Sequence, residues 1–485
     1  MTAPGERRRS LILAGGGLKV ALQAGVLQVW LDEAGLEFDH VDGASGGVFN
    51  LAMLCQGMSG TDVADNWRGL PAHRMVQPNW RAFMRPLTGE SMTSLGALRE
   101  RIFPHWGLDL DAIRSSRLEA TFNTYNFSRH ELDVITPGRL TEDLLVSCVS
   151  LPMWFPPVQV DGDTYIDAVY ISDANVEEAI RRGADEIWAI WTVSELSEWR
   201  GGFLGNYFGI IETAANGHFR RILRRIEESN AALERGEAGE FGRPIEVKLL
   251  RAEVPLHYLL NMNPDRFTQA VERGVAAARE WCAEEGIALT PAPSRPREPG
   301  ARVRFDERLT GSLDDGSPLK LGLRVDIDDL DAFIADLDHA ARVSGEVESP
   351  LLGGARPIED GEVEVLADDG DFRRKRVRYR LHFHDGDGRP LTLAGERRVE
   401  RGVLRQAGTL RLRIVSGHVD AGAEGAELQA EGLVRLGAAG VLGQLRSLQA
   451  EGPGGRSAAL RRLGLLWVGG LWDAHAGRLL PVSPV

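Results

Sequence analysis

The chain has 485 residues, more than one ordinary hydrophobic core holds, so we expect roughly two or three domains. Its net charge of −14 argues against broad nucleic-acid binding, which needs a basic face. The cysteines Cys55, Cys148 and Cys282 are too few and too far apart to define a disulfide framework or a zinc site. The first apolar run is too short for a signal peptide, and no apolar run of about 18 residues occurs. We therefore expect a soluble, cytoplasmic protein, with peripheral membrane contact left open.

The first 290 residues alternate between strand and helix patterns. A buried strand at 10–14 precedes a helix at 18–34, and a short strand at 39–42 precedes an apolar helix at 48–56. The alternation continues with strands at 120–127, 132–136, 164–167, 186–193 and 245–250, and with helices at 141–150, 177–182, 207–235 and 264–285. Strands that alternate with helices predict an α/β domain with a largely parallel sheet.

The pattern changes after residue 290. Residues 291–300 contain four prolines, so they form a linker rather than the interior of an element. Beyond it apolar and polar residues alternate with period two, which is typical of half-buried strands, at 319–327, 374–385, 390–401 and 409–419. Helical patterns interrupt them at 329–341 and 457–474. We therefore expect a first domain over 1–290 and a second, antiparallel β-rich domain over 301–485, which is a roll, a barrel or a sandwich.

Three short segments of the first domain carry candidate chemistry. Gly15, Gly16, Gly17, Leu18 and Lys19 follow the first strand, Gly43-Ala44-Ser45-Gly46-Gly47 follows the second, and Asp167 ends a later strand. Loops at the carboxyl ends of strands are where open α/β sheets bind ligands. The second segment has the G-x-S-x-G pattern of a nucleophile elbow, in which Gly43 and Gly47 allow a tight turn and Ser45 points outward at a helix N-terminus. The triple glycine supplies a second set of backbone N–H donors for an oxyanion, and Lys19 holds that loop or adds positive potential.

The base that accepts the proton of Ser45 is the next question. In ordinary α/β-hydrolases several strands precede the elbow and a histidine follows it, whereas here only one strand comes before the elbow strand. The histidines are poor candidates, because they fall on a helix face, in a loop or in the second domain: His218, His257, His382 and His384. We therefore expect Asp167 to act as the base directly, since a carboxylate can do so when the geometry is tight and water is excluded.

The order of these segments resembles that of the patatin-like phospholipase family over roughly residues 8–285. The segments are LILAGGGLKVALQAGVLQVWLDEAG, then VDGASGG, then SLPMWFPPVQVDGDTYIDAVYISDANVEEAIRRGADEIWAI. The resemblance implies a three-layer α/β fold, a lipid acyl hydrolase and a catalytic dyad with Ser45 as nucleophile and Asp167 as base. It also implies an oxyanion hole lined by the backbone of Gly15–Leu18, with Lys19 in the basic position of the family and no cofactor or metal.

The chain departs from the family pattern at a few positions beside these motifs. Val20 stands where the family usually has glycine, Ala168-Val169 follow the aspartate in place of Gly-Gly or Gly-Ala, and Ala174-Asn175 replace Asn-Pro. These positions shape loops and therefore affect how a substrate fits. Two alternatives to hydrolysis stay open: a catalytically weak or inactive lipid-binding scaffold, and an acyltransferase on the same fold.

The remaining features have less specific interpretations. The segment 203–229 places an apolar run beside several arginines, which fits a lid that touches anionic lipid, but we favour a helix packed on the sheet with a solvated basic face. Trp80, Phe83 and Met84 form either a cap over the site or the core of a small subdomain. His382 and His384 place two imidazoles on one strand face, but no third metal ligand is apparent in the sequence.

Overall fold

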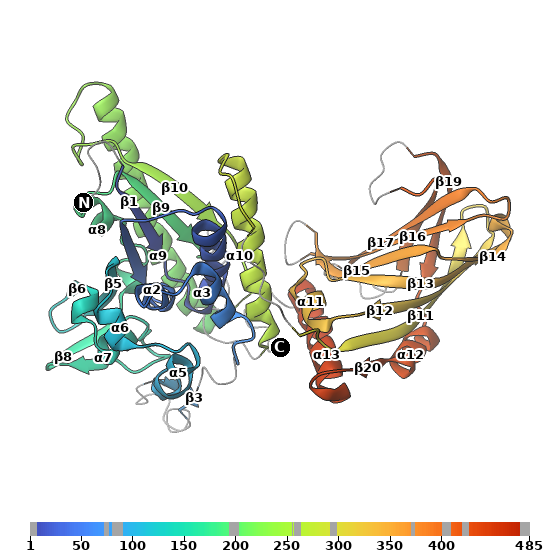
Figure 1. Ribbon diagram of the computed structural model, residues 1–485, viewed down its shortest axis with the longest axis horizontal. Coiled ribbons are helices and arrows are strands. Elements are labelled where there is room, and N and C mark those ends of the chain that lie inside the picture. Colours follow the sequence, from blue (N-terminus) through green and yellow to red (C-terminus); the bar gives the residue numbers. More distant parts are fainter. Residues whose placement is uncertain are drawn as a thin grey trace. The chain divides into compact units, whose positions relative to one another are not determined.

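The computed structural model describes residues 7–71, 77–79, 91–193, 203–254, 256, 263–291, 298–369, 374–399, 409–419 and 426–475. The chain divides into two compact units, Met1–Ser294 and Arg295–Ser483 (Figure 1). The expected linker at 291–300 falls at this division, and its residues 292–297 lie outside the described part. Among the described residues, no helix is both long enough and apolar enough to cross a lipid bilayer.

The N-terminal unit is built on an eight-stranded sheet with the order β10-β9-β1-β2-β5-β8-β7, in which β6 also pairs with β5. Five strands run parallel: β1 (Arg9–Leu13), β2 (His40–Ala44), β5 (Glu119–Asn126), β9 (Glu186–Trp191) and β10 (Glu246–Arg251). Three are antiparallel to their neighbours: β6 (Glu131–Ile135), β7 (Val158–Val160) and β8 (Asp163–Asp167). The prediction of an α/β fold with a mostly parallel sheet is confirmed.

Helices cover both faces of this sheet, and the alternation along β1 shows why. Leu11 and Leu13 belong to a core that they share with α1, α2, α3 and α10, whereas Ile12 lies in a second core with α8 and much of α9. The helices are η1 (Gly17–Val20), α1 (Ala21–Leu27), η2 (Gln28–Glu33), α2 (Gly47–Cys55), α3 (Gly60–Trp67), η4 (Leu98–Ile102), α5 (Phe103–His105), α6 (Leu110–Arg114), η5 (Pro137–Arg139), α7 (Glu142–Ser147), η6 (Ala168–Tyr170), α8 (Val176–Arg181), α9 (Phe203–Glu234) and α10 (Asp265–Glu284). A two-stranded ribbon joins β3 (Gln77–Pro78) and β4 (Thr93–Ser94).

Two local predictions can be compared with these elements. The helix expected at 18–34 is one continuous path, but it begins as a 3-10 turn in η1 and ends as a π-helix in η2. Thr141 caps α7 as expected, because its hydroxyl accepts a hydrogen bond from the backbone N–H of Leu144 at 3.1 Å.

The strand that ends at Asp167 reaches the edge of the sheet in an unexpected way. The expectation was a loop at the carboxyl end of a parallel strand, but β8 runs antiparallel to β5. Asn123 of β5 pairs with Ala44 at the end of β2, and β5 then continues beyond that edge, where β8 pairs with it. Because β8 runs back along this extension, Asp167 pairs with Thr124, one residue past the partner of Ala44.

The C-terminal unit is a closed antiparallel barrel of eight strands. The path β12-β11-β19-β18-β17-β16-β15-β13 closes because β13 also pairs with β12. The strands are β11 (Arg302–Leu313), β12 (Pro318–Ile327), β13 (Ala340–Ser349), β15 (Asp360–Asp368), β16 (Lys375–His384), β17 (Pro390–Val399), β18 (Thr409–Ser416) and β19 (Leu428–Arg435), with the shorter β14 (Gly354–Pro357) and β20 (Gln449–Glu451) attached. Of the three architectures left open by the sequence, the barrel is the one that forms.

Four helices accompany the barrel: α11 (Leu330–Ala335), η7 (Pro350–Leu352), α12 (Ala438–Ser447) and α13 (Gly455–His475). α11 and α13 lie together at one end of the barrel (Figure 1) and are joined by an ion pair between Arg462 and Asp331. The helix expected at 329–341 was too long. It ends at Ala335 because the carboxylate of Asp336 accepts the backbone N–H of Ala340, which turns the chain into β13.

Candidate active site

Ser45 occupies a strained turn between β2 and α2. Its φ angle is 46°, a left-handed value that side chains other than glycine rarely adopt. The two residues after it must be glycine, because an added Cβ at Gly46 would lie 2.4 Å from the carbonyl oxygen of Gly17, and one at Gly47 would lie 2.2 Å from that of Leu13. Gly43 is less constrained, since its Cβ would meet Leu51 at 3.0 Å. The elbow geometry therefore depends most on the two glycines that follow the serine.

Ser45 and Asp167 are in direct contact. The Ser45 hydroxyl donates a hydrogen bond of 2.6 Å to Oδ2 of Asp167, and the second carboxylate oxygen accepts the backbone N–H of Val169 at 2.9 Å. The two side chains are 8% and 2% exposed. Burial raises the pKa of Asp167 to about 7, and the hydrogen bonds from Ser45 and Val169 oppose that rise. The residues predicted as nucleophile and base thus lie at hydrogen-bonding distance in a dry environment.

The glycine loop adjoins the elbow, but one of its predicted donors is already occupied. The backbone N–H of Gly15 donates to the carbonyl oxygen of Asp173 at 2.8 Å, so it is not available to an oxyanion. Within the described residues, no other group accepts a hydrogen bond from the N–H groups of Gly16, Gly17 or Leu18 at the start of η1. The candidate oxyanion hole is therefore these three residues.

Two of the loop glycines are required by space. A Cβ on Gly15 would lie 1.8 Å from a carboxylate oxygen of Asp173 and 2.9 Å from Cβ of Ser45. Gly16 has a φ of 151°, and a Cβ there would lie 2.4 Å from the hydroxyl of Thr192. Only bare backbone can pass between these groups, which explains the run of glycines.

The departures from the family pattern fit into this geometry. Val20 is buried below the elbow, where its Cγ1 would lie 3.1 Å from a Cβ on Gly46. Val169 supplies the N–H that orients the Asp167 carboxylate. Lys19 lies on η1 and is 7% exposed.

The last departure, Asn175, ties the two halves of the site together. Its amide donates to the side-chain oxygen of Asn123 at 2.7 Å, and the amide of Asn123 donates in turn to the carbonyl oxygen of Gly43 at 2.8 Å. Asn175 also caps α8 by accepting the N–H of Glu178. A chain of buried amides thus links the segment after Asp167 to the elbow strand.

Sequence reasoning missed Asp173. Its carboxyl group is 2% exposed and has no hydrogen-bond partner among the described residues, and burial, aided by the charge of Asp167, raises its pKa well above the usual range. Because it lies six residues after Asp167, past a turn of helix, nothing in the local pattern indicated that it returns beside Ser45. The close approach of Gly15 to it places a neutral, protonated carboxyl group at the wall of the site.

A narrow cavity of about 70 Å³ opens at Ser45 and Asp167. Most of its walls are apolar side chains from α2, η4, the segment before β7, and α9: Phe49, Leu98, Val149, Leu151, Phe155, Phe208, Ile211 and Ala215. α9 therefore packs on the domain with one face, as favoured from the sequence, and its N-terminal half also forms a wall of the cavity. Arg220, Arg221 and Arg224 are exposed on it.

None of the described residues that line this cavity is a histidine. His218 is half-buried on α9 rather than fully exposed, and burial lowers its pKa. His382 and His384 lie in the C-terminal unit. Four sequence candidates, His257, Trp80, Phe83 and Met84, lie outside the described residues.

Comparison with known proteins agrees with this site. Residues 11–180 match the model of the patatin-like phospholipase family, so the N-terminal unit carries a patatin-like phospholipase domain. The resemblance stated from the sequence is thereby confirmed for this stretch, which includes β1, the glycine loop, the elbow and Asp167.

Individual relatives match over part of their length only. The chain is 29% identical over 187 residues to Lysophospholipase nte1 of Aspergillus terreus and 31% identical over 183 residues to Lysophospholipase NTE1 of Phaeosphaeria nodorum. These matches cover 38% and 37% of this chain but only 12% of each relative. Among solved structures, VipD from Legionella pneumophila aligns with a TM-score of 0.33 and 13% identity, covering 57% of this chain and 67% of that one.

Proposed function

We propose that the protein is a serine acyl hydrolase of the phospholipase A or lipid esterase type, with Ser45 as nucleophile and Asp167 as base. The observation that carries the proposal is the hydrogen bond of 2.6 Å between the two side chains, beneath an apolar cavity. The match of residues 11–180 to the patatin-like phospholipase family supports the same class of reaction.

The reaction follows from the geometry in two halves. As Ser45 Oγ attacks the carbonyl carbon of an ester, its proton passes to Oδ2 of Asp167, and the carbonyl oxygen becomes an oxyanion. The N–H groups of Gly16, Gly17 and Leu18 stabilise that charge, each by roughly 3 kcal/mol in systems of this kind. Asp167 then protonates the departing alcohol, which leaves an acyl group on Ser45. A water molecule that loses its proton to Asp167 releases the acid and restores the serine.

The nature of the cavity and of the relatives supports a lipid as the substrate. The walls around Ser45 are mainly hydrocarbon, which suits an acyl chain and disfavours a sugar or a peptide. Two of the relatives are lysophospholipases by name. Exposed Ile210, next to the cavity wall on α9, and the arginines farther along that helix would suit peripheral contact with an anionic lipid surface.

The departures from the family pattern do not argue for an inactive scaffold. Val169 keeps its N–H on the base, and Val20 fills space without entering the contact between Ser45 and Asp167. Hydrolysis is separated from acyl transfer by analysing the products after glycerol or a lysolipid is added. Transfer would give a new ester in place of free acid.

The proposal is tested with purified full-length protein and a short-chain nitrophenyl ester. We expect Ser45→Ala and Asp167→Asn each to lower kcat/KM by roughly 1,000-fold or more, as the loss of a nucleophile or its base does in serine hydrolases. Ser115→Ala, on the surface, and Asp163→Asn, on the same strand as Asp167, are the matched controls and should keep activity. A fluorophosphonate probe should label wild type and not Ser45→Ala. Unchanged hydrolysis by Ser45→Ala would refute the proposal.

A further inference from the structure

Three segments of the C-terminal barrel bring metal-binding side chains to one place. Glu359 precedes β15, His384 ends β16, and His418 follows β18. One ligand atom from each lies within 4.8 Å of the others. The sequence indicated only the pair His382 and His384, because Glu359 and His418 are contributed by segments 25 and 34 residues away from His384.

The fold explains how His418 arrives there. β18 ends at Ser416, and Gly417, with a φ of 88°, turns the chain. Its N–H donates to the carbonyl oxygen of Pro390 at 2.7 Å, and its own carbonyl oxygen accepts the hydroxyl of Thr392 at 2.7 Å. Both partners belong to the first residues of β17, which pairs with β16. The chain is therefore pinned across β17, and the next residue, His418, is directed at the end of β16.

The imidazole rings are held in fixed orientations. The rings of His384 and His418 meet edge to face with centroids 5.1 Å apart, and His382 stacks on His418 at 4.9 Å, nearly parallel. Nε2 of His418 lies 3.4 Å from the carbonyl oxygen of Phe383, which leaves its Nδ1 for another partner. Histidines that bind metal typically give their second ring nitrogen to such a backing oxygen.

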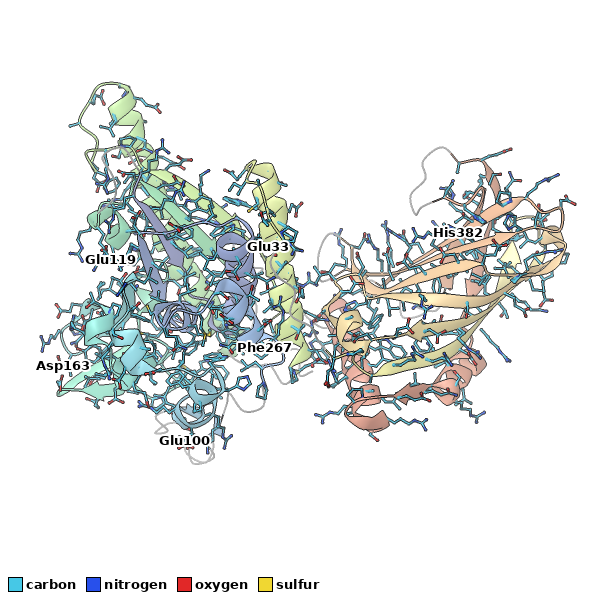
Figure 2. The ribbon with its side chains drawn as sticks, viewed as in Figure 1. Glu33, Glu100, Glu119, Asp163, Phe267 and His382 are labelled. Atoms are coloured by element: carbon cyan, nitrogen blue, oxygen red, sulfur yellow. The ribbon has the colours of Figure 1, made fainter. Side chains whose placement is uncertain are left out.

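The carboxylates of the cluster supply the charge that a cation needs. Oε1 of Glu359 lies 2.6 Å from Nδ1 of His384, and Oδ2 of Asp360 lies 3.7 Å from Nδ1 of His382. His382 contacts the carbonyl oxygen of Val419 through Nε2 at 3.2 Å (Figure 2 labels His382 on the barrel). His382 is thus placed behind His418 as an orienting neighbour rather than as a ligand.

We propose that Glu359, His384 and His418 bind a divalent transition-metal ion of the zinc type. Two imidazoles and one carboxylate form a common ligand set for Zn²⁺, with water in the remaining position. Bond lengths of about 2.0–2.2 Å require small rotations of the side chains from their present separation, and the ion replaces the proton shared by Glu359 and His384. The site lies far from any acyl chemistry in the sequence, and the ion would fasten the ends of three barrel segments. This differs from the expectation of no metal.

The test uses untagged full-length protein, stripped with a chelator and then dialysed against 10 µM-scale Zn²⁺ or Co²⁺ (about that concentration, to exclude weak surface binding). We expect about one ion per chain by elemental analysis, a Co²⁺ absorbance spectrum of low coordination number, and a metal-dependent rise in Tm. His384→Ala, His418→Ala and Glu359→Gln should each weaken binding tenfold or more. The matched control His105→Ala, an exposed histidine of the other unit, should bind as wild type does.

Other ligands and misfolding are separated by design. The thiols are poor competitors, because Cys55, Cys148 and Cys282 are buried and burial raises the pKa of each. Circular dichroism of the metal-free variants checks that they fold, and His384→Asn and His418→Asn are used if an alanine variant does not. Absence of stoichiometric binding to wild type overturns the proposal, and so does binding that survives substitution of both His384 and His418.

Discussion

At the scale of single residues, the environment of Asp167 determines when the site can work. Burial raises its pKa to about 7, whereas a carboxyl group in water is already ionised near pH 4. A base must be deprotonated to accept the proton of Ser45. The fraction of competent enzyme therefore falls as the pH drops through the pKa and is complete above it.

This predicts a particular pH profile for the hydrolysis of a short-chain ester. We expect kcat/KM to fall about tenfold per unit below pH 7 and to level off above it. The measurement is made between pH 5.5 and 9 on protein whose fold is checked at each pH by fluorescence (these limits are roughly those at which Asp167 changes state). A profile that is flat across pH 7, or that falls as the pH rises through it, would contradict the role of Asp167 as base.

Single residues also show where sequence reasoning stopped. Ser45 and Asp167 were found because each lies in a recognisable motif in the expected order. Asp173, Glu359 and His418 were not, because their neighbours come from elements far away in the chain, and no local pattern records that a loop turns back. The engagement of Gly15 by the carbonyl oxygen of Asp173 has the same origin.

At the scale of elements, the elbow and the glycine loop form one tightly packed unit. The backbone of Gly46 touches that of Gly17, so the position of the nucleophile and that of the candidate oxyanion donors depend on each other. A single methyl group at Gly46 is expected to push the start of η1 away from Ser45.

We therefore predict that Gly46→Ala lowers kcat/KM by about 100-fold or more, the loss expected when one oxyanion donor is displaced. The overpacking should cost roughly 1–3 kcal/mol of stability, so the variant stays folded at moderate temperature. Gly138→Ala is the control, because a Cβ there meets nothing within 4 Å. Wild-type kinetics in Gly46→Ala would mean that the loop adapts and that the coupling is absent.

Elements were predicted well where the pattern is local and poorly where it is not. Period two in β16 and the capped start of α7 located both elements within a few residues. The helix at 329–341 was too long because the apolar spacing continues through Ala340 and Ala341, and only the side chain of Asp336 marks the true end. β8 was expected as one more strand end, and its antiparallel direction depends on an extension of β5 that no residue type signals.

At the scale of the whole molecule, the chain contains two units with separate cores. Leu11, Phe122 and Phe267 belong to one core, whereas Phe305, Leu381 and Ile414 belong to another. The second unit closes through pairing of β11 with both β12 and β19, and β19 lies more than a hundred residues farther along the chain. The sequence indicated strands there, but a period-two pattern does not identify the partner of a strand, so barrel and sandwich could not be told apart.

Two separate cores predict two unfolding transitions in differential scanning calorimetry. A fluorophosphonate adduct on Ser45 should raise the midpoint of one transition, and Zn²⁺ should raise that of the other, because a ligand stabilises only the unit that binds it. Each shift should disappear in Ser45→Ala and in His384→Ala, respectively. One transition that both ligands move together would show that the units unfold as a single cooperative block.

The antiparallel return of β8 has a consequence for the life history of the chain. The proposed base is synthesised 122 residues after the proposed nucleophile, and it reaches that nucleophile only once β8 has paired with β5. A nascent or truncated chain that ends before Asp167 has a serine on an elbow but no group to take its proton. Reactivity toward lipids would thus be withheld until the sheet is complete, which protects the membranes that surround protein synthesis from a half-made enzyme.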